Sequence, residues 1–528
     1  MHYGKETKSL RLEKEHVLSS TLANRSEDLT PLQSRSRTTE DTFYLPADSP
    51  DRDFNVGDEP TKDQQTLPDP QVQLLADYLH TENYRRKKLL DEEHWEAVYG
   101  KMFKSFYQCA TKTSNWGDQL CWDKDWKRQC GCQNPRSRAV VLVDLLCRKE
   151  NTIEFCDCQP DQVRLIQMGY IGGAPKYPRT AFSIRLLQFH HILWKHSAVS
   201  ITPFAKSLDE FLDCNNPLIL VNRPNSLEDS HTSRQWRRTL SSSVDAYREM
   251  LRREQIVSED LLKMSTMDKM SDLCPKCFGP PVAGKKPEEP DYIVCMDGNF
   301  QHRRHKASSK EVIALKTPSL FVEQDDVQAM AISMNDTRFG DAEAQQSLDR
   351  CTNQHTAADN LRGSHTWKAC DDTGLFGMAC RHDQILRLIN IERSGERAYF
   401  PMTMVDFLLK STQTEGDISK RYGFLYDIGC NIEKGIIKRD QFPEERSKNQ
   451  LIFGTSVFHA YVHEWSCQLK YNPRLNPGWG MSDGEGLERV WAYLSPLISP
   501  LRYSTKNHRL SALHLRSAHH NEVGKMHA

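Results

Sequence analysis

Three acidic positions in the sequence have surroundings that favour chemistry. Asp297 follows the apolar run "YIVCM", and Asp427 follows "FLY". A buried charge is costly unless it is paired, and acids at strand ends usually project into a site. In "GWGMSDGEGLERVWAYLSPLI", Glu485 and Glu488 are three residues apart and would share one side of a helix. Each acid alone is most simply a cap or a surface residue. Together, two strand-borne aspartates and a helix-borne glutamate could hold two divalent cations about 4 Å apart.

Cysteine pairs give a second signal. Cys130 and Cys132 precede the strand-like stretch "AVVLVDLL", and Cys156 and Cys158 follow it. Four thiolates brought together by a hairpin match a tetrahedral zinc site. Such a site could contribute ~10 kcal/mol or more to the stability of a small module. The alternative is a set of unrelated buried thiols, and a second site could be completed by Cys109, Cys121 and Cys147.

Other cysteines and histidines form incomplete groups. "LCPKCFG" places Cys274 and Cys277 in zinc-knuckle spacing without a second such pair, so the sequence predicts a possible zinc half-site whose other ligands are unknown. Two further groups could converge or share a helix face, although isolated Cys and His are more often packed than metal-bound. They are Cys351, Cys370, Cys380 and His382, and His459, His463 and Cys467.

The chain divides by composition into four stretches. Residues 1–70 are too polar to bury a core and are expected to form a disordered tail. Apolar residues at helical intervals follow in 72–109, at the start of a cysteine-rich module predicted over 72–215. Residues 216–272 are polar and helix-prone, and they are either an exposed charged helix or a basic surface for nucleic acid. That stretch contains Trp236 and Arg234, Arg237, Arg238, Arg248, Arg252 and Arg253.

The last stretch, 273–528, alternates short apolar runs with helical patterns, which favours a mixed α/β domain. Within it, residues 302–372 are weakly patterned and are expected to form an insertion or long loop.

Bulk composition excludes some classes of protein. The formal net charge of −1 gives no global basic field, so any nucleic-acid binding must come from local patches. The N-terminus has no signal-peptide core, and the longest aliphatic stretch is too short to cross a bilayer. We therefore expect an intracellular protein without membrane contact, whose sixteen cysteines are free thiols or metal ligands.

Five motifs in order resemble the Kyakuja-Dileera-Zisupton (KDZ) transposases. They are "IVCMDGNFQHRRH", "TGLFGMACRHD", "YDIGCNIEK", "FHAYVHEWSCQLKYNPR" and "GWGMSDGEGLERVWAYLSP". The resemblance covers roughly residues 72–528. The segment around the two Cys-x-Cys pairs also resembles the CxC-type cysteine cluster associated with these transposases, particularly in "DQVRLIQMGYIGGAPKYPRTAFSIRLLQFHHILW". The resemblance implies an α/β, RNase H-like catalytic domain, a mixed sheet flanked by helices, after a cysteine-rich, zinc-binding α+β module.

The resemblance also implies a DDE-type acidic triad that binds Mg²⁺ or Mn²⁺. Asp297 would be its first acid, Asp427 its second, and Glu488 its third, with Glu485 as a close rival. The implied reaction is cleavage of a phosphodiester at a transposon end, followed by attack of the freed 3′-hydroxyl on target DNA. Backbone phosphates could be held by Arg303, Arg304 and Lys306, which could equally form an exposed hairpin.

The implied partners are transposon ends and target DNA in the nucleus, with possible self-association and no small-molecule substrate. Two other functions stay open. One is a truncated, non-catalytic transposase remnant whose zinc module binds DNA or protein, since family members commonly continue well beyond the position of Ala528. The other is a metal-dependent nuclease without strand transfer.

Overall fold

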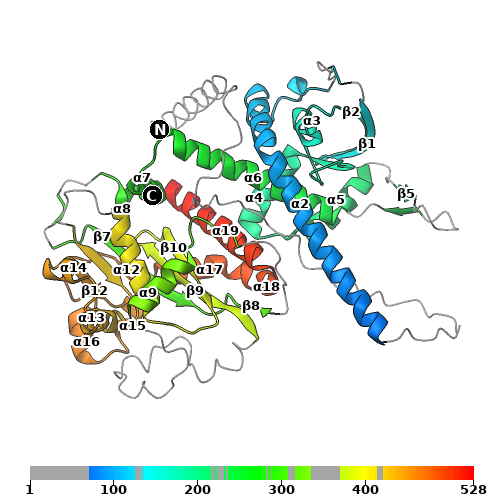
Figure 1. Cartoon of the computed structure of the whole chain (residues 1–528). Helices are drawn as coiled ribbons and strands as arrows, with labels where there is room; N and C mark the ends of the chain where they lie inside the picture. Colours follow the sequence, from blue (N-terminus) through cyan, green and yellow to red (C-terminus); the bar gives the residue numbers. More distant parts are fainter. Residues whose placement is uncertain are drawn as a thin grey trace. The chain divides into compact units, whose positions relative to one another are not determined.

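The computed structural model describes residues 70–124, 131–132, 135–215, 220–222, 231–233, 236–280, 284–286, 288–306, 315–334, 369–412 and 420–527. Backbone contacts divide the chain into two compact units, the first ending at Leu262 and the second beginning at Lys263 (Figure 1). Within the described ranges, none of the helices combines the length and apolar character that crossing a bilayer demands. The predicted tail 1–70 lies outside the described residues, except for its last residue.

Unit 1 mixes helices with a small sheet. Its elements are α2 (Pro70–Lys112), η1 (Gln119–Cys121), β1 (Arg136–Val143), β2 (Arg148–Phe155), α3 (Asp161–Gln167), β3 (Tyr170–Gly172), β4 (Thr180–Ser183), α4 (Ile184–Ser197), α5 (Ile201–Asn215), β5 (Leu220–Asn222), β6 (His231–Ser233) and α6 (Arg237–Leu261).

The sheet of unit 1 has the order β2-β1-β4-β3, and the second half of β1 and all of β3 and β4 are buried. Alternate residues of β1 point to opposite faces, so Val140 and Leu142 join a core with Trp122, while Val141 and Val143 join a larger core under the helices. The predicted helical periodicity of the segment before it is confirmed in α2. Its buried stripe is Trp95, Tyr99, Met102 and Phe106.

Helix α6 buries, wholly or in part, most of the arginines considered for a basic surface in 216–272. Leu240, Val244 and Tyr247 are buried in the core of unit 1. Arg248 is buried too, with its guanidinium 4.8 Å from the centre of the Trp194 ring. Two further arginines bond to the carboxylate of Glu249, which is fully buried: Arg252 and Arg253. Arg234 lies outside the described residues. Arg248, Arg252 and Arg253 are therefore used in packing against the core, whereas Arg237 is half-buried and Arg238 is exposed.

Unit 2 contains α7 (Thr266–Leu273), α8 (Pro275–Phe278), β7 (Tyr292–Asn299), β8 (Arg304–His305), α9 (Gln324–Ser333), β9 (Cys370–Cys380), β10 (Ile385–Glu392), α12 (Tyr399–Thr412), β11 (Tyr422–Leu425), α13 (Gly429–Lys438), α14 (Pro443–Ser447), β12 (Leu451–Gly454), α15 (Val457–Ala460), α16 (Trp465–Tyr471), α17 (Gly486–Leu494), η4 (Ser495–Leu497), α18 (Ile498–Leu501) and α19 (Lys506–His527).

The main sheet of unit 2 is mixed. Its strand order is β10-β9-β7-β11-β12, with β8 paired to β9. β7, β9 and β10 pair antiparallel, whereas β11 is parallel to both β7 and β12. The mixed α/β character predicted for this region is confirmed.

Helices cover both faces of this sheet. Alternation along β7 sends Val294 and Met296 into a large core shared with α7, α9, α12 and α13. Ile293, Cys295 and Asp297 take the opposite face, where α17 packs on β7 and β9 and α19 packs on α17 and β10 (Figure 1). The acid at the end of β7 therefore lies on the side covered by α17.

The described part of the interval 302–372 is not a plain loop. Helix α9 forms within it, and Phe321 makes a bridge to Leu388 of β10. Leu320, Phe321 and Val322 are buried, as is Val327 on α9. These four apolar side chains hold the segment against the core. The sequence around them is polar, so their pattern is too short to predict this from the sequence.

Candidate acidic site and cysteine clusters

Asp297 lies near the end of β7 opposite a glycine. In the antiparallel pairing of β7 with β9, Asp297 faces Gly377. A Cβ atom at Gly377 would come within 2.9 Å of Trp491 of α17, so this position leaves room for the helix to approach. The indole Nε1–H of Trp491 donates to Asp297 Oδ2 at 2.6 Å, and the Gly298 N–H donates to Oδ1 at 2.7 Å. The first acid thus has a fixed orientation.

Asp427 occupies the equivalent place on the neighbouring strand. Leu425 of β11 pairs in parallel register with Cys295 of β7, and each aspartate follows its paired residue by two positions. Parallel neighbours end at the same edge of a sheet, so the two aspartates are adjacent there. The Ser456 hydroxyl donates to Asp427 Oδ1, and His459 Nδ1 lies 3.0 Å from the same oxygen.

The two glutamates near the start of α17 have different environments. Glu485 is buried and accepts a hydrogen bond of 3.0 Å from the Phe458 N–H. Glu488 is exposed in the first turn of α17, one turn before Trp491. Trp491 contacts Asp297, and Glu488 lies three residues before it on the same side of α17. Glu488 therefore also faces the first aspartate. The predicted buried stripe of Leu487, Trp491 and Leu494 is confirmed.

The charges of these acids act on one another. Burial raises the pKa of Asp297 well above its ordinary value, and the negative charges of Asp427, Glu488 and Glu396 raise it further. The hydrogen bond with Asp427 raises the pKa of His459 to about 9. Burial is the main cause of the raised pKa of Glu485. The site is therefore a concentration of negative charge around a desolvated carboxyl group.

Glu396 is an acid that sequence reasoning missed. Burial raises the pKa of Glu396 to about 7, and the Tyr426 hydroxyl donates to its carboxylate. Its Oε1 lies 3.6 Å from the position a Cβ would take at Gly298, next to Asp297. No apolar strand flanks Glu396 in "ERSGERAYF", so its sequence gives no sign that it lies in the site. We use "acidic cluster" for Asp297, Glu396, Asp427, Glu485 and Glu488.

Three other groups bring ligand atoms closer together. In each, the sulfur or nitrogen atoms all lie within 4.8 Å of one another, whereas the acidic cluster forms no such group in the described chain. The three are Cys132, Cys156 and Cys158; Cys274, Cys277, Cys380 and His382; and Cys430, His463 and Cys467. Each could hold a metal ion, and thiolate with imidazole is the donor set that zinc takes in structural sites.

The first group contains three of the four predicted Cys-x-Cys thiols. β1 and β2 pair antiparallel with Arg136 opposite Phe155, so Cys132 before β1 and Cys156 after β2 meet at one end of the hairpin. Cys156 Sγ and Cys158 Sγ are 3.0 Å apart. Cys130 lies outside the described residues. Among described cysteines, Cys109, Cys121 and Cys147 join none of the three groups.

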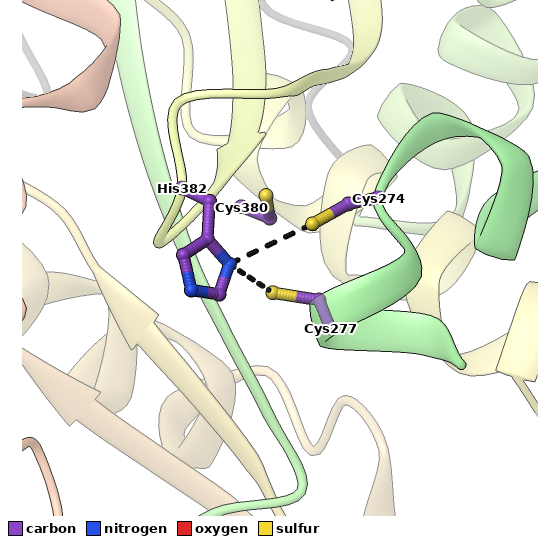
Figure 2. Close-up of side chains that lie close together, drawn as sticks. All are labelled: Cys274, Cys277, Cys380 and His382. Carbon is purple, nitrogen blue, oxygen red and sulfur yellow. Dashed lines mark hydrogen bonds between the residues drawn. The ribbon is translucent and has the colours of Figure 1, made fainter. Parts of the chain in front are cut away.

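The second group completes the Cys274–Cys277 half-site with ligands from a distant strand. His382 Nδ1 lies 3.1 Å from Cys277 Sγ and 3.6 Å from Cys274 Sγ, and Cys380 lies beside them (Figure 2). Cys380 and His382 were expected to converge with Cys351 and Cys370. Cys351 lies outside the described residues, and Cys370 is at the other end of the 11-residue strand β9, which explains why it cannot join.

The third group separates residues that were expected on one helix. His463 Nδ1 lies 3.7 Å from Cys430 Sγ, and its Nε2 lies 2.8 Å from the Asp427 carbonyl oxygen. His459 does not join them. The chain forms two short helices, α15 and α16, with a turn between, so His459 turns to Asp427 while His463 and Cys467 turn to Cys430.

The predicted phosphate-binding residues differ in exposure. Arg304 is buried and bonds to Asp372, which is also buried, so it does not face solvent as predicted. Its place on β8, paired with β9, explains the burial. Arg303 is half-buried and donates to the Phe300 carbonyl at 2.8 Å, and Lys306 is exposed.

The fold and these groups define a two-unit, mixed α/β protein with cysteine and histidine groups able to hold metal ions. Residues 290–521 match the family model of the Kyakuja-Dileera-Zisupton transposase, and residues 115–216 match that of the CxC1-like cysteine cluster associated with KDZ transposases. Two separate segments of the chain are therefore similar to KDZ transposases and to the cysteine cluster associated with them. No curated protein and no solved structure was found to match it. The resemblance stated from the sequence is confirmed.

Proposed function

We propose that this chain is a DDE-type DNA transposase that cleaves a phosphodiester at a transposon end and joins the freed 3′-hydroxyl to target DNA. Asp297, Asp427 and Glu488 are the proposed catalytic acids, with Glu485 as the alternative third. The observation that carries the proposal is the matching register of two acids at one edge of the sheet: Asp297 near the end of β7, and Asp427 just beyond the parallel neighbour β11. Helix α17 is bonded to Asp297 through Trp491.

The sheet order supports an RNase H-like fold for unit 2. β7, β9 and β10, with the two-residue strand β8 between the first two in the chain, pair antiparallel in turn, and β11 and β12 then add in parallel on the other side of β7. The first two proposed acids belong to the strands at the centre of this order. Helices on both faces complete the expected layers.

The residues present fit a divalent cation. The acidic cluster holds five carboxyl groups, of which Asp427 lies 3.0 Å from His459 Nδ1. Hard oxygen ligands of this kind suit Mg²⁺ or Mn²⁺. A cation between Asp297, Asp427 and Glu488 would offset the repulsion that, after burial, adds to the raised Asp297 pKa. Bound metal ions would activate the attacking oxygen and stabilise the leaving one.

The chain's own residues orient the acids. Trp491 and the Gly298 N–H fix both oxygens of Asp297, which leaves little freedom for its carboxylate to rotate. Ser456 and His459 hold one oxygen of Asp427, and the hydrogen bond with Asp427 raises the pKa of His459 to about 9. Preorganised ligands of this kind reduce the entropy lost when metal and DNA bind.

Unit 1 supplies the proposed zinc module. Cys132, Cys156 and Cys158 meet at one end of the β1–β2 hairpin, with Cys130 as the expected fourth ligand. We place the reaction in the nucleus, where the DNA partners are, and expect self-association when two transposon ends are joined. The exposed side chain of Lys306 and the half-buried Arg303 stay candidates for phosphate contact.

The test is cleavage of duplex DNA taken from the genomic flanks of the coding sequence, with Mg²⁺ or Mn²⁺. Asp297→Asn and Asp427→Asn should each reduce cleavage at least ~100-fold, because a metal contributes several kcal/mol to the transition state and each 1.4 kcal/mol is tenfold. Asp406→Asn is the matched control, since Asp406 only pairs with Lys410 on α12. Full activity in either active-site variant would refute the assignment.

A second assay separates transposase from nuclease. A pre-cleaved flank with a free 3′-hydroxyl is supplied with plasmid target, and joined products are counted. Joining supports the transposase, and cleavage without joining identifies a metal-dependent nuclease. DNA binding with neither activity in the wild type identifies a non-catalytic DNA-binding remnant.

A further inference from the structure

A group of four ligands in unit 2 meets at a place that the proposed reaction does not use. Cys274 caps the start of α8, and Cys277 lies within that helix. Cys380 is the last residue of β9, and His382 is in the turn that leads to β10. Figure 2 shows the four side chains pointing toward one another from these two segments. We call them the CCCH cluster.

The distances suit a tetrahedral metal. Zinc–sulfur bonds of about 2.3 Å and zinc–nitrogen bonds of about 2.0 Å place neighbouring ligand atoms roughly 3.5–3.8 Å apart around a tetrahedron. In the CCCH cluster, His382 Nδ1 lies 3.1 and 3.6 Å from two of the sulfurs, and all four ligand atoms lie within 4.8 Å of one another. Small movements of these side chains would bring all four ligand atoms within bonding distance of one ion.

Burial also favours a closed structural site. The side chains of Cys274 and Cys380 are 1% and 0% exposed, and His382 closes the cluster at its solvent side. Four protein ligands leave no position open for water or substrate, which is the arrangement of structural rather than catalytic zinc. Three sulfurs and one imidazole also exclude Mg²⁺ and Ca²⁺, which prefer oxygen.

The cluster joins two segments that are distant in the chain, since His382 is 108 positions from Cys274 and 105 from Cys277. Phe278 at the end of α8 stacks on Tyr292, the first residue of β7, with ring centres 5.2 Å apart. On the other side, the turn after His382 continues to Asp383, which has a φ of 62°. The ion would therefore hold this turn against the segment that leads into the central strand.

That turn also contacts the helix of the third proposed acid. Asp383 receives two hydrogen bonds from Arg489 of α17, at 2.6 and 2.7 Å, and a Cβ at Gly486 would lie 2.7 Å from Asp383 Oδ1. The Asp383 carbonyl oxygen lies 3.0 Å from His520 Nε2 of α19. The start of α17 is thus fixed to the residue that follows His382.

We propose that Cys274, Cys277, Cys380 and His382 bind one structural Zn²⁺, which anchors the β9–β10 turn and, through Asp383 and Arg489, positions the start of α17. The zinc site stands independently of the DDE proposal. Only its effect on catalysis rests on the proposed function.

The first experiment measures zinc per full-length chain by inductively coupled plasma mass spectrometry. Cys277→Ser and His382→Ala should each contain one zinc fewer than the wild type, while Cys370→Ser, a buried cysteine on the same strand as Cys380, should lose none. His382→Cys should retain the ion, because four thiolates also bind zinc. Unchanged zinc in Cys277→Ser and His382→Ala would overturn the proposal.

The second experiment replaces zinc with Co²⁺ and follows visible absorption. A tetrahedral thiolate site gives intense bands, and part of this signal should disappear in His382→Ala and return in His382→Cys. Hydrogen exchange then reports on positioning: residues 380–383 and the start of α17 should exchange faster in His382→Ala than in the wild type. Faster exchange confined to 380–383 would retain the metal site and refute the link to α17. Neither measurement depends on cleavage, so they stay informative if the chain proves non-catalytic.

Discussion

The acidic cluster and the CCCH cluster are built in opposite ways within the same unit. Among the described residues, the acids form no group of three or more whose ligand atoms all lie within 4.8 Å of one another. Each aspartate is held by protein donors of its own. The four CCCH ligands converge and contact one another. A structural ion needs a closed, convergent set of ligands, whereas a catalytic site must keep space for substrate and water. The difference agrees with the two proposals, a structural ion at the CCCH cluster and catalysis at the acidic cluster.

The sharpest way to break this comparison is to remove each metal separately. Omitting Mg²⁺ and Mn²⁺ should abolish cleavage, leave the thermal unfolding curve of the protein nearly unchanged, and be reversed by adding Mg²⁺. Treatment with 1,10-phenanthroline should lower the unfolding temperature and cleavage together, because structural zinc contributes on the order of 10 kcal/mol to folding. Restoration should then require Zn²⁺.

Calorimetry and the DNA cleavage assay on the same samples measure both effects. The non-chelating isomer 1,7-phenanthroline is the control for nonspecific binding of the reagent. If 1,10-phenanthroline left the unfolding temperature unchanged, the assignment of structural zinc would be wrong for all the cysteine groups.

The parts of the acidic site that local pattern encodes could be predicted from the sequence. Apolar runs before Asp297 and Asp427 predicted strands, and both residues lie at or just beyond the ends of β7 and β11. The stripe at Leu487 and Trp491 likewise predicted α17. These features depend on hydrophobic periodicity over a few residues, which burial in a core imposes directly.

The parts that depend on distant segments could not be predicted. Cys274 and His382 are 108 positions apart, and no local spacing connects a helix start with a strand end. The same reason explains the wrong grouping of Cys380 with Cys370 and the omission of Glu396. Arg304 was wrongly assigned to solvent because its partner, Asp372, enters from another strand. The Cys-x-Cys spacing did predict that cysteines of both pairs lie together, because one hairpin connects the two pairs.

The next prediction distinguishes the two glutamates of the acidic cluster. Glu488→Ala should reduce cleavage ~100-fold, consistent with loss of a metal ligand worth several kcal/mol, and change stability by less than about 0.5 kcal/mol because the residue is exposed. Glu485→Ala should mainly destabilise the fold by about 1–3 kcal/mol, since it leaves the Phe458 N–H without its acceptor. Urea unfolding and the cleavage rate are measured for both.

The opposite result would assign the role of third acid to Glu485 instead of Glu488. If Glu485→Ala abolished cleavage at unchanged stability while Glu488→Ala stayed active, Glu485 would be the third acid. Arg489→Lys provides a control on α17, because it weakens the contact with Asp383 without removing a carboxylate.

The smallest effect concerns stability and pH. The pKa of Asp297 in the folded protein is raised above its ordinary value of 3.8, chiefly by burial, so the folded state binds this proton more tightly than the unfolded state. Its contribution to stability is therefore fully present below pH 3.8 and is lost as pH rises through the folded pKa.

Asp297→Asn keeps an oxygen for the Trp491 N–H but carries no charge. In buffer without Mg²⁺ or Mn²⁺, the variant should match the wild type at acid pH and be more stable at neutral pH, as measured by urea midpoints. Asp406→Asn, which removes a surface ion pair, should show no such gain. A variant less stable than the wild type at neutral pH would mean that Asp297 is held by favourable contacts rather than strained by its neighbours, and the acidic cluster would then resemble the CCCH cluster in serving the fold.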